Sequence, residues 1–358
     1  KAPPGPLYVG NSGTTIRLMA GLLAGQAFDV ELSGDVSLNQ RPMERVAKPL
    51  RSMGAMVVTA EGGCPPIKIT GGQRLKGIHY DLPMASAQVK SCVMLAGLYA
   101  QGQTSVTEPA PTRDHTERML EGFGYRVERT HDTCSIEGQG QLTATDIDVP
   151  SDISSATFFL VAAAICPDSD LVIEHVGMNP TRIGVVNILR LMGANLSIQN
   201  EREVGGEPVA DLAIKYAPLK GIHVPEDQVP LAIDEFPALM IAAACASGTT
   251  TITGAEELRV KESDRIQAMV DGLSAMGVMI KGTTDGAIIQ GMGADTQFAA
   301  AQITTHHDHR IAMAFTIAGL RAGASLKILD CAHVATSFPN FVELARTVGI
   351  TLDEEFES

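Results

Sequence analysis

The chain has 358 residues, a formal net charge of −14, 45% hydrophobic residues and 19% charged residues. This composition predicts a globular protein of about two domains and excludes a disordered one. The negative charge and the aromatic content of only 4% argue against a nucleic-acid partner, because binding nucleic acid requires basic or base-stacking surfaces.

The first segment with chemical character is Tyr8-Val-Gly-Asn-Ser-Gly-Thr-Thr-Ile-Arg17, a turn followed by a helix that is predicted to begin near Thr14. Free backbone N–H groups at a helix start favour an anion, and Arg17 lies one turn in. Most turns of this kind are structural, so the segment alone leaves both interpretations open.

A second helix is predicted after Gln40-Arg-Pro-Met-Glu-Arg45, with Pro42 at its first position and Arg41 directly before it. Proline suits this position because its fixed φ is already helical. Arg41 would then point out of the turn, either toward a ligand or into solvent.

The next two predicted helices also follow polar segments. Ala85-Ser-Ala-Gln-Val-Lys90 precedes an apolar helix over residues 91–98, and its hydroxyl, amide and ammonium groups suit a phosphate. Arg113-Asp-His-Thr-Glu117 opens a helix over residues 118–122 in a similar way. Ordinary helix capping is the alternative for both segments.

Five apolar helical patterns end in a glycine and are followed by a β-prone run; the glycines are Gly54, Gly124, Gly193, Gly277 and Gly349. Glycine ends a helix in the left-handed region at little cost, and a strand can start at once. The spacing, roughly 70 to 85 residues, predicts repeats of mixed helices and strands that pack into globular domains, with chance recurrence as the alternative. A Pro/Ser/Asp cluster at residues 149–155 predicts a boundary that leaves domains 1–149 and 150–358.

In the second predicted domain, Asp234 and Glu235 precede an apolar run over residues 238–246. A carboxylate beside a buried helix can have a raised pKa and act as a base. An acidic first turn that complements the helix dipole would explain the same residues.

Leu258-Arg-Val-Lys-Glu-Ser-Asp-Arg265 brings cations and carboxylates together between the β-prone residues 250–253 and an amphipathic helix over residues 266–276. Ser263 is predicted to cap this helix. Lys261 and Arg265 could meet one small anion beside Glu262, whereas a solvated charged turn is the alternative.

Thr305-His-His-Asp-His-Arg310 invites a metal hypothesis, because His307 and His309 have the spacing of one strand face. No third ligand has an obvious spacing, and the adjacent Arg310 attracts anions, so we expect no metal. The six cysteines form no C-x-x-C pair, which indicates free thiols in a reducing, cytoplasmic compartment. Those in apolar runs, Cys92, Cys166 and Cys245, are expected to be buried, and no apolar run is long enough to predict a membrane span.

Together these segments resemble the 5-enolpyruvylshikimate-3-phosphate synthase family of enolpyruvyl transferases, in the family's order and over nearly the whole chain. Besides those quoted above, the matching segments are Asn179-Pro-Thr-Arg182, Asp234-Glu-Phe-Pro237, Asp308-His-Arg310 and Thr336-Ser-Phe-Pro339. The Ser-Ala-Gln-x-Lys, Arg-x-His-x-Glu and Asn-x-Thr-Arg forms look like the bacterial class II branch.

The resemblance implies an α/β (α+β) fold of two domains, built from six βαβαββ units with the active site between the domains. About five units are present here, and the family's N-terminal Lys-Ser-x-x-x-Arg motif is absent. The resemblance therefore predicts that roughly 80 residues of a full-length member precede this chain. Thr336 stands where the other branch has a lysine that binds phosphoenolpyruvate.

The implied activity is that of an enzyme of the shikimate pathway, 3-phosphoshikimate 1-carboxyvinyltransferase. It transfers the enolpyruvyl group of phosphoenolpyruvate to the 5-hydroxyl of shikimate 3-phosphate by addition and elimination of phosphate. The implied ligands of shikimate 3-phosphate are Ser86, Ala87, Gln88 and Arg113 in the first domain, which holds mainly this substrate, and Asp234 and Lys261 in the second. Those of phosphoenolpyruvate are Asn11, Gly13, Arg41, Gln88, Arg265 and Arg310, with the main ones in the second domain.

Addition–elimination requires a base, an acid and cations on the leaving group. Asp234 is predicted as the base and Glu262 as its proton-transfer partner, with no metal or organic cofactor. We expect a monomer with small-molecule partners only. The alternatives are UDP-N-acetylglucosamine enolpyruvyl transferase, which would use a reactive loop cysteine, and an inactive anion-binding form.

Overall fold

The structure is a computed structural model that describes residues 1–355. The chain forms two compact units. Unit 1 comprises Lys1–Asp148 and Gly205–Glu207, and unit 2 comprises the rest. Within the described residues, none of the helices is both long and apolar enough to cross a membrane.

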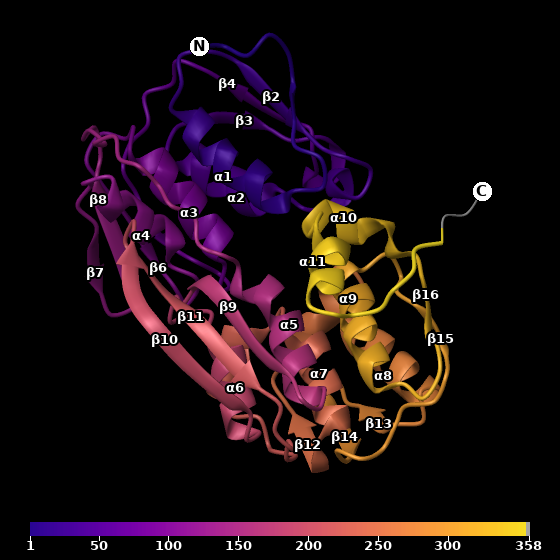
Figure 1. Cartoon of the computed structure of the whole chain (residues 1–358). Helices are drawn as coiled ribbons and strands as arrows, with labels where there is room; N and C mark the ends of the chain where they lie inside the picture. Colours follow the sequence, from indigo (N-terminus) through magenta and orange to yellow (C-terminus); the bar gives the residue numbers. More distant parts are fainter. Residues whose placement is uncertain (356–358) are drawn as a thin grey trace. The chain divides into compact units, whose positions relative to one another are not determined.

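Unit 1 contains two successive βαβαββ repeats, which can be followed in Figure 1. The first has β1 (Leu7–Tyr8), α1 (Gly13–Ala24), β2 (Val30–Ser33), α2 (Glu44–Ser52), β3 (Met56–Val58) and β4 (Ile67–Thr70). The second has β5 (His79–Asp81), α3 (Ala87–Gly97), β6 (Gln103–Thr107), α4 (His115–Gly122), β7 (Glu128–Thr130) and β8 (Thr133–Glu137). Their sheets have equivalent strand orders, β1-β2-β4-β3 and β5-β6-β8-β7, and the first two strands of each are parallel.

The two repeats of unit 1 pack against each other through α1 and α3. The backbones come so close that a Cβ at Gly21 would lie 2.1 Å from the carbonyl oxygen of Cys92. Only glycine fits there, because no side chain can share space with a neighbouring backbone. This contact sets α1 and α3 side by side, and with them the N-terminal ends that carry Gly13 and Gln88.

Unit 2 continues the same order of elements. The third repeat has α5 (Ile153–Ile165), β9 (Asp170–Gly177), α6 (Gly184–Leu191), β10 (Asn195–Val204) and β11 (Glu207–Lys215). The fourth has α7 (Phe236–Cys245), β12 (Ser247–Ile252), α8 (Arg265–Ala275), β13 (Met279–Gly282) and β14 (Ala287–Met292). Isolated parallel bridges, such as Ser151 with Val176, stand where the first strand of the third and of the fourth repeat would lie.

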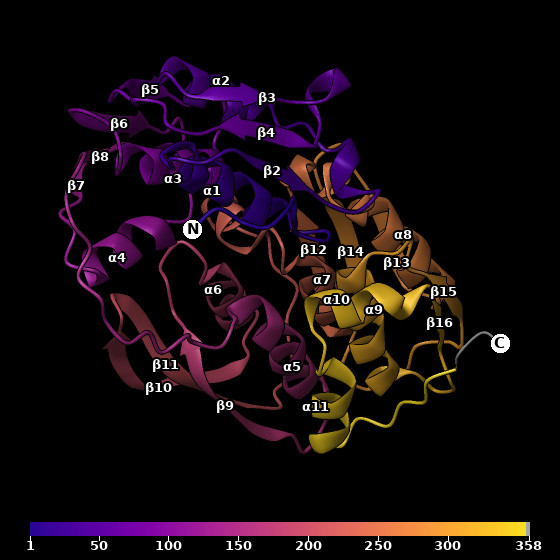
Figure 2. The same cartoon turned by 90° about the horizontal axis from the view of Figure 1, so that it is seen from above.

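The fifth repeat has β15 (Gln302–Thr304), α9 (His309–Ala318), β16 (Lys327–Leu329), α10 (Val334–Ser337) and α11 (Phe341–Thr347). Helices α5, α7 and α9 pack against one another at the centre of unit 2, as both views show (Figures 1 and 2). Every residue of α7 is buried, which explains its continuous apolar sequence without amphipathic periodicity. The buried helices give the residues at their N-terminal ends, Asp234 and Arg310 among them, a rigid support.

The predicted helix ends are confirmed. All five repeat glycines have positive φ, with values of 97° (Gly54), 73° (Gly124), 91° (Gly193), 87° (Gly277) and 90° (Gly349). A strand starts within a few residues after the first four, but none follows Gly349 within residues 350–355.

Several local predictions are wrong. The cap of α8 is Asp264, which accepts from Gln267 N, and not Ser263, whose hydroxyl is engaged elsewhere. Pro42 precedes α2 instead of opening it, since that helix starts at Glu44. The histidine segment is a turn at the start of α9, with His307 at φ 60°, and not a strand. Cys166 is only partly buried.

Candidate active site

In unit 1 the N-terminal ends of α1 and α3, together with the turn before α2, carry a group of polar side chains that we call the arginine cluster: Arg17, Arg41, Asn11 and Gln88, with Gly13. Arg17 Nη1 donates to Gln88 Oε1 (2.6 Å), and Arg41 Nη2 donates to Asn11 Oδ1 (2.9 Å). Ser12 caps α1 by accepting from Thr15 N. The cluster therefore joins four of the sequence-predicted residues at one helix start and adds Arg17.

The arginine cluster has an excess of positive charge. Burial and the charges of Arg45 and Arg41 lower the pKa of Arg17 to about 10. Within residues 1–355, neither Arg17 nor Arg41 makes an ion pair, and the buried Nε of Arg17 has no hydrogen-bond partner. An anion bound here would relieve the repulsion and add charge-assisted hydrogen bonds.

Gly13 leaves the room in which the guanidinium groups lie. A Cβ at this position would come within 3.0 Å of Arg17 Nη1 and 3.2 Å of Arg41 Nη1. The contact is tighter than ordinary van der Waals packing, so any side chain would displace an arginine. The predicted place of Gly13 in an anion pocket is consistent with this geometry.

Other predicted residues of unit 1 lie at the starts of α3 and α4. Ser86 caps α3 by accepting from Val89 N (3.4 Å), Ala87 is the first residue of α3, and Gln88 Nε2 donates to Thr14 Oγ1 (2.8 Å). Arg113 lies just before α4.

The phosphate role suggested for the Lys90 ammonium group does not fit the structure. Lys90 is only 1% exposed and pairs with Glu117 (2.7 Å) on α4 and with Glu108 (3.0 Å). Burial alone would lower the pKa of Lys90, but the two carboxylates outweigh it and raise the pKa. The Ser-Ala-Gln-x-Lys and Arg-x-His-x-Glu segments are thus joined by a buried ion pair between their last residues.

The main charged group of unit 2 is Arg265, whose side chain is 1% exposed. Its Nε donates to Asp308 Oδ2 (2.9 Å), Nη1 to Asp234 Oδ1 (3.3 Å) and Nη2 to Glu262 Oε2 (2.6 Å). Lys261 Nζ lies 3.4 Å from the same Asp234 oxygen and 2.5 Å from Glu257 Oε1. The predicted Asp234, Lys261, Glu262 and Arg265 are therefore brought together, around an arginine that already has three carboxylate partners.

The charges of this group compensate one another. Burial would lower the pKa of Arg265, but Asp308 and Glu262 outweigh it and raise the pKa. Burial would raise the pKa of Asp308, but the charge and hydrogen bonds of Arg265 and the N–H of Arg310 lower it. Asp234 and Glu262 are thus held in position by a common cation, an arrangement suited to fixing a general base and its proton-transfer partner.

Arg310 lies in a second part of the unit 2 site. Its Nη1 donates to the backbone oxygen of Asp234 (3.0 Å) and lies 3.9 Å from Glu235 Oε1. Glu235 is 3% exposed and accepts from the Ser154 hydroxyl. Its pKa is raised, mainly by burial and further by Asp234, although Arg310 opposes the shift.

The comparisons with known proteins agree with one another. The profile of the family described as EPSP synthase (3-phosphoshikimate 1-carboxyvinyltransferase) matches residues 1–344. A 3-phosphoshikimate 1-carboxyvinyltransferase of Methylococcus capsulatus is 62% identical over 353 residues, which are 99% of this chain and 80% of that protein. One of Hydrogenovibrio crunogenus is 61% identical over 357 residues, 98% of this chain and 80% of that protein. A solved EPSP synthase structure from Acinetobacter baumannii has a TM-score of 0.93 and 61% identity, covering 99% of this chain and 81% of that one.

The chain belongs to the EPSP synthase family. Its activity is the transfer of the enolpyruvyl group from phosphoenolpyruvate to shikimate 3-phosphate. The family, fold and enzyme class predicted from the sequence are confirmed.

Four of the cysteines do not offer the activated thiol that the rival enolpyruvyl transferase would use. Burial raises the pKa of Cys92, Cys134 and Cys245 to about 12 in each case. The exposed Cys331 also has a raised pKa, mainly because of partial burial and then because of Asp330. A thiol with a raised pKa carries little of the nucleophilic thiolate at neutral pH.

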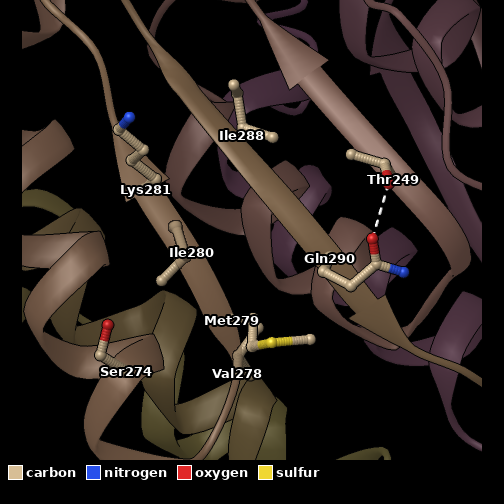
Figure 3. Close-up of a pocket in the computed structure, with 8 residues that line it drawn as sticks. All are labelled: Thr249, Ser274, Val278, Met279, Ile280, Lys281, Ile288 and Gln290. Carbon is tan, nitrogen blue, oxygen red and sulfur yellow. Dashed lines mark hydrogen bonds between the residues drawn. The ribbon is translucent and has the colours of Figure 1, made fainter.

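A hollow of about 410 Å³ lies over the β12-β14-β13 sheet of unit 2, lined by Met279, Ile288, Thr249 and Gln290 among others (Figure 3). Thr249 donates to Gln290 across it (2.6 Å). None of the residues predicted for EPSP synthase chemistry lines this hollow. Within residues 1–355, no group of three or more His, Cys, Asp or Glu side chains could hold a metal ion.

Arg17, Glu235 and Asp308 belong to the charged groups described above but are outside the set of ligands and catalytic residues that the family resemblance implies; the sequence pointed to Arg17 and Glu235 only as members of their segments. Asp308 is fully buried and caps α9 by accepting from Arg310 N. Each of the three lies inside a segment that carries the family resemblance. The sequence signal that could have indicated them is a charged residue beside a predicted buried helix. The sequence does not show which of several neighbouring charged side chains points inward, and the structure does.

Proposed function

We propose that the enolpyruvyl transfer is carried out by the two charged groups described above, with different tasks. Asn11, Gly13, Arg41 and Gln88 of unit 1, together with Arg265 and Arg310 of unit 2, bind phosphoenolpyruvate. Ser86, Ala87, Gln88 and Arg113 of unit 1, together with Asp234 and Lys261 of unit 2, bind shikimate 3-phosphate.

The main support for phosphoenolpyruvate binding by unit 1 is the excess of positive charge near the start of α1. Arg17 and Arg41 both lie beside Gly13, and neither forms an ion pair within residues 1–355; the nearest carboxylate influence is that of Asp35, whose pKa the charge of Arg41 helps to lower. Phosphoenolpyruvate carries a phosphate and a carboxylate, and planar guanidinium groups bind such anions through paired N–H donors. Ser86, at the partly exposed start of α3, adds a hydroxyl that suits the phosphate of the acceptor.

The chemistry belongs to unit 2 in this proposal. Asp234 removes the proton from the 5-hydroxyl of the acceptor as its oxygen attacks C2 of phosphoenolpyruvate, and Glu262 supplies a proton to the methylene carbon. As the bond from C2 to phosphate then breaks, the ionised Glu262 takes a proton back from the methyl carbon and the double bond re-forms. The proton held by Asp234 passes to the leaving phosphate, whose charge the arginines stabilise. Arg265, fixed between Asp234 and Glu262, keeps both carboxylates in place; to bind phosphoenolpyruvate it has to share its donors with them.

The test is phosphate release from phosphoenolpyruvate with three acceptor conditions. We expect release with shikimate 3-phosphate, none with UDP-N-acetylglucosamine and none without an acceptor. Release with the nucleotide sugar would contradict the acceptor assignment, and no release in any condition would favour an inactive anion-binding form. That the protein is a cytoplasmic monomer and needs no cofactor stays a prediction from the sequence.

A further inference from the structure

Glu235 is a buried carboxylate that directly follows the proposed base, Asp234. We propose that Glu235 is a proton-linked positioning residue: it takes up a proton when phosphoenolpyruvate binds Arg310, and its ionised form weakens that binding. The inference rests on the proposed role of Arg310 and adds a residue to which the enolpyruvyl transfer chemistry itself assigns no task.

The geometry places Glu235 inside a network of charged side chains. Ser154, 1% exposed near the start of α5, donates its hydroxyl proton to Glu235 Oε1 and accepts from Arg182 Nη2 (2.5 Å). The same Arg182 nitrogen donates to Asp152 Oδ1 (2.7 Å). On the other side, Arg310 Nη1 lies 3.9 Å from Glu235 Oε1.

The pKa values of the two carboxylates in this network are shifted in opposite directions. Burial would raise the pKa of Asp152, but Arg182 and Arg310 outweigh it and lower the pKa. The pKa of Glu235 is instead raised, by burial first. The pairing with Arg182 therefore favours the ionised form of Asp152, whereas burial favours the neutral form of Glu235 beside Arg310.

An anion that binds Arg310 acts directly on Glu235. Like charges within a few ångströms favour the neutral form of a carboxyl group, so a bound anion raises its proton affinity. By linkage, an ionised Glu235 weakens the binding of the anion by the same free energy. A neutral Glu235 keeps its hydrogen bond from Ser154 and leaves the charge of Arg310 to the ligand.

The groups that face Glu235 are Asp234 in its own segment, Ser154 and Asp152 at the start of α5, Arg182, and Arg310 on α9. His309 precedes Arg310, but burial and the charge of Arg310 lower its pKa to about 4. His309 is therefore neutral at the pH values where a raised carboxyl pKa has its effect. The protons of Glu235 can be measured without interference from that imidazole.

The experiment measures phosphoenolpyruvate binding by calorimetry, without acceptor so that no turnover occurs, in buffers of different ionisation enthalpy. Wild type and Glu235→Gln are compared from pH 5 to pH 9. The glutamine keeps the size of the side chain and an acceptor for Ser154, but it cannot titrate. The phosphate of the ligand titrates in the same pH range. Its contribution is the same for both proteins, so the result is read from the difference in proton uptake per bound ligand between wild type and Glu235→Gln.

We expect wild type to take up more protons per bound ligand than Glu235→Gln. Its affinity should fall with rising pH relative to the variant, by up to about tenfold per pH unit where one proton is fully coupled. At the acid end the two affinities should be equal. Glu174→Gln, which removes an exposed carboxylate on β9, is the matched control and should behave as wild type.

Equal proton uptake in wild type and Glu235→Gln would overturn the inference while leaving the proposed function intact. A variant that binds more weakly than wild type at every pH would show a packing role only, and would overturn it as well. No binding by wild type would contradict the proposed function itself. If Glu235→Gln does not fold, Ser154→Ala is used: losing the hydroxyl donor should move the pH-dependent fall in affinity to higher pH, and an unchanged profile would overturn the inference.

Discussion

Two arginines at the starts of helices, Arg17 in unit 1 and Arg265 in unit 2, have opposite environments. Burial and two neighbouring arginines lower the pKa of Arg17 to about 10. Arg265 is also buried, but Asp308 and Glu262 raise its pKa. Both are nearly inaccessible to solvent, with exposed fractions of 8% and 1%.

The comparison separates two uses of a buried charge. A cation without a counter-ion costs folding free energy, and an incoming anion returns part of it as binding free energy. A cation among carboxylates is already satisfied and serves instead to hold those carboxylates. Changes in unit 1 should therefore affect ligand binding, whereas changes around Arg265 should affect stability and the chemical step.

The largest effect is expected for Asp308→Asn, which removes a fully buried carboxylate from Arg265. Breaking a buried ion pair costs about 3 to 5 kcal/mol, and we expect the lower end because Asp234 and Glu262 remain. Urea unfolding followed by circular dichroism measures this free energy. The exposed Asp295→Asn is the control and should change it by less than about 0.5 kcal/mol.

The pH dependence of the free energy of unfolding tests whether the loss of stability in Asp308→Asn comes from the ion pair with Arg265. The folded-state pKa of Asp308 is lowered, so its contribution to stability is present above its unfolded pKa and is lost as pH falls through the folded value. The stability gap between wild type and Asp308→Asn should hence shrink below about pH 4. A gap that stays constant in acid would mean that the ion pair is not its origin.

The next effect concerns the two carboxylates that Arg265 holds. Asp234→Asn and Glu262→Gln should each lower kcat by about a hundredfold or more, the range of general acid–base groups. Steady-state phosphate release with both substrates measures it, with the exposed Glu256→Gln as control. A wild-type kcat in either variant would remove that residue from the mechanism.

A smaller effect, on binding alone, is expected for Arg41→Gln in unit 1. Losing one or two charge-assisted hydrogen bonds should raise KM for phosphoenolpyruvate by about 10- to 100-fold. The free energy of unfolding should stay equal or rise, because repulsion of Arg17 is relieved. Lys48→Gln, an exposed change on α2, is the control; a large loss of stability in Arg41→Gln would contradict the division between the two units.

The sequence predicted the parts of this structure that depend on local chemistry. Left-handed glycines, such as Gly54 and Gly277, end their helices as expected, because only the backbone conformation of one residue is involved. The family and its repeated fold followed from the order of the segments. The cap of α8 was misplaced by one residue, since Ser263 and Asp264 can both cap and the choice depends on Asp308, 45 residues away.

The direction of each charged side chain could not be predicted from the sequence. Lys90 lies one turn from the α3 start, like a phosphate ligand, but it turns inward to Glu117 and Glu108. Glu235 follows Asp234 directly, and yet only Glu235 is enclosed by Ser154 and α9. Both outcomes depend on contacts between distant segments, which local patterns do not contain.

The smallest effect, and the sharpest test of the unit 1 interpretation, is expected for Gly13→Ala. The new Cβ would lie 3.0 Å from Arg17 Nη1 and 3.2 Å from Arg41 Nη1, both flexible ends that can move. Moving one of them off its preferred rotamer costs about 0.5 to 1.5 kcal/mol, so KM for phosphoenolpyruvate should rise by about 2- to 12-fold. Stability should not fall, because alanine is the better helix former.

The matched control for Gly13→Ala is Gly5→Ala, where a Cβ meets nothing within 4 Å. An unchanged KM in Gly13→Ala, with Arg41→Gln still impaired, would mean that the anion does not use the space between the two guanidinium groups. The double variant Gly13→Ala/Arg41→Gln adds a further check. If the methyl group acts by displacing Arg41, the two changes should not be additive, because residues in contact couple.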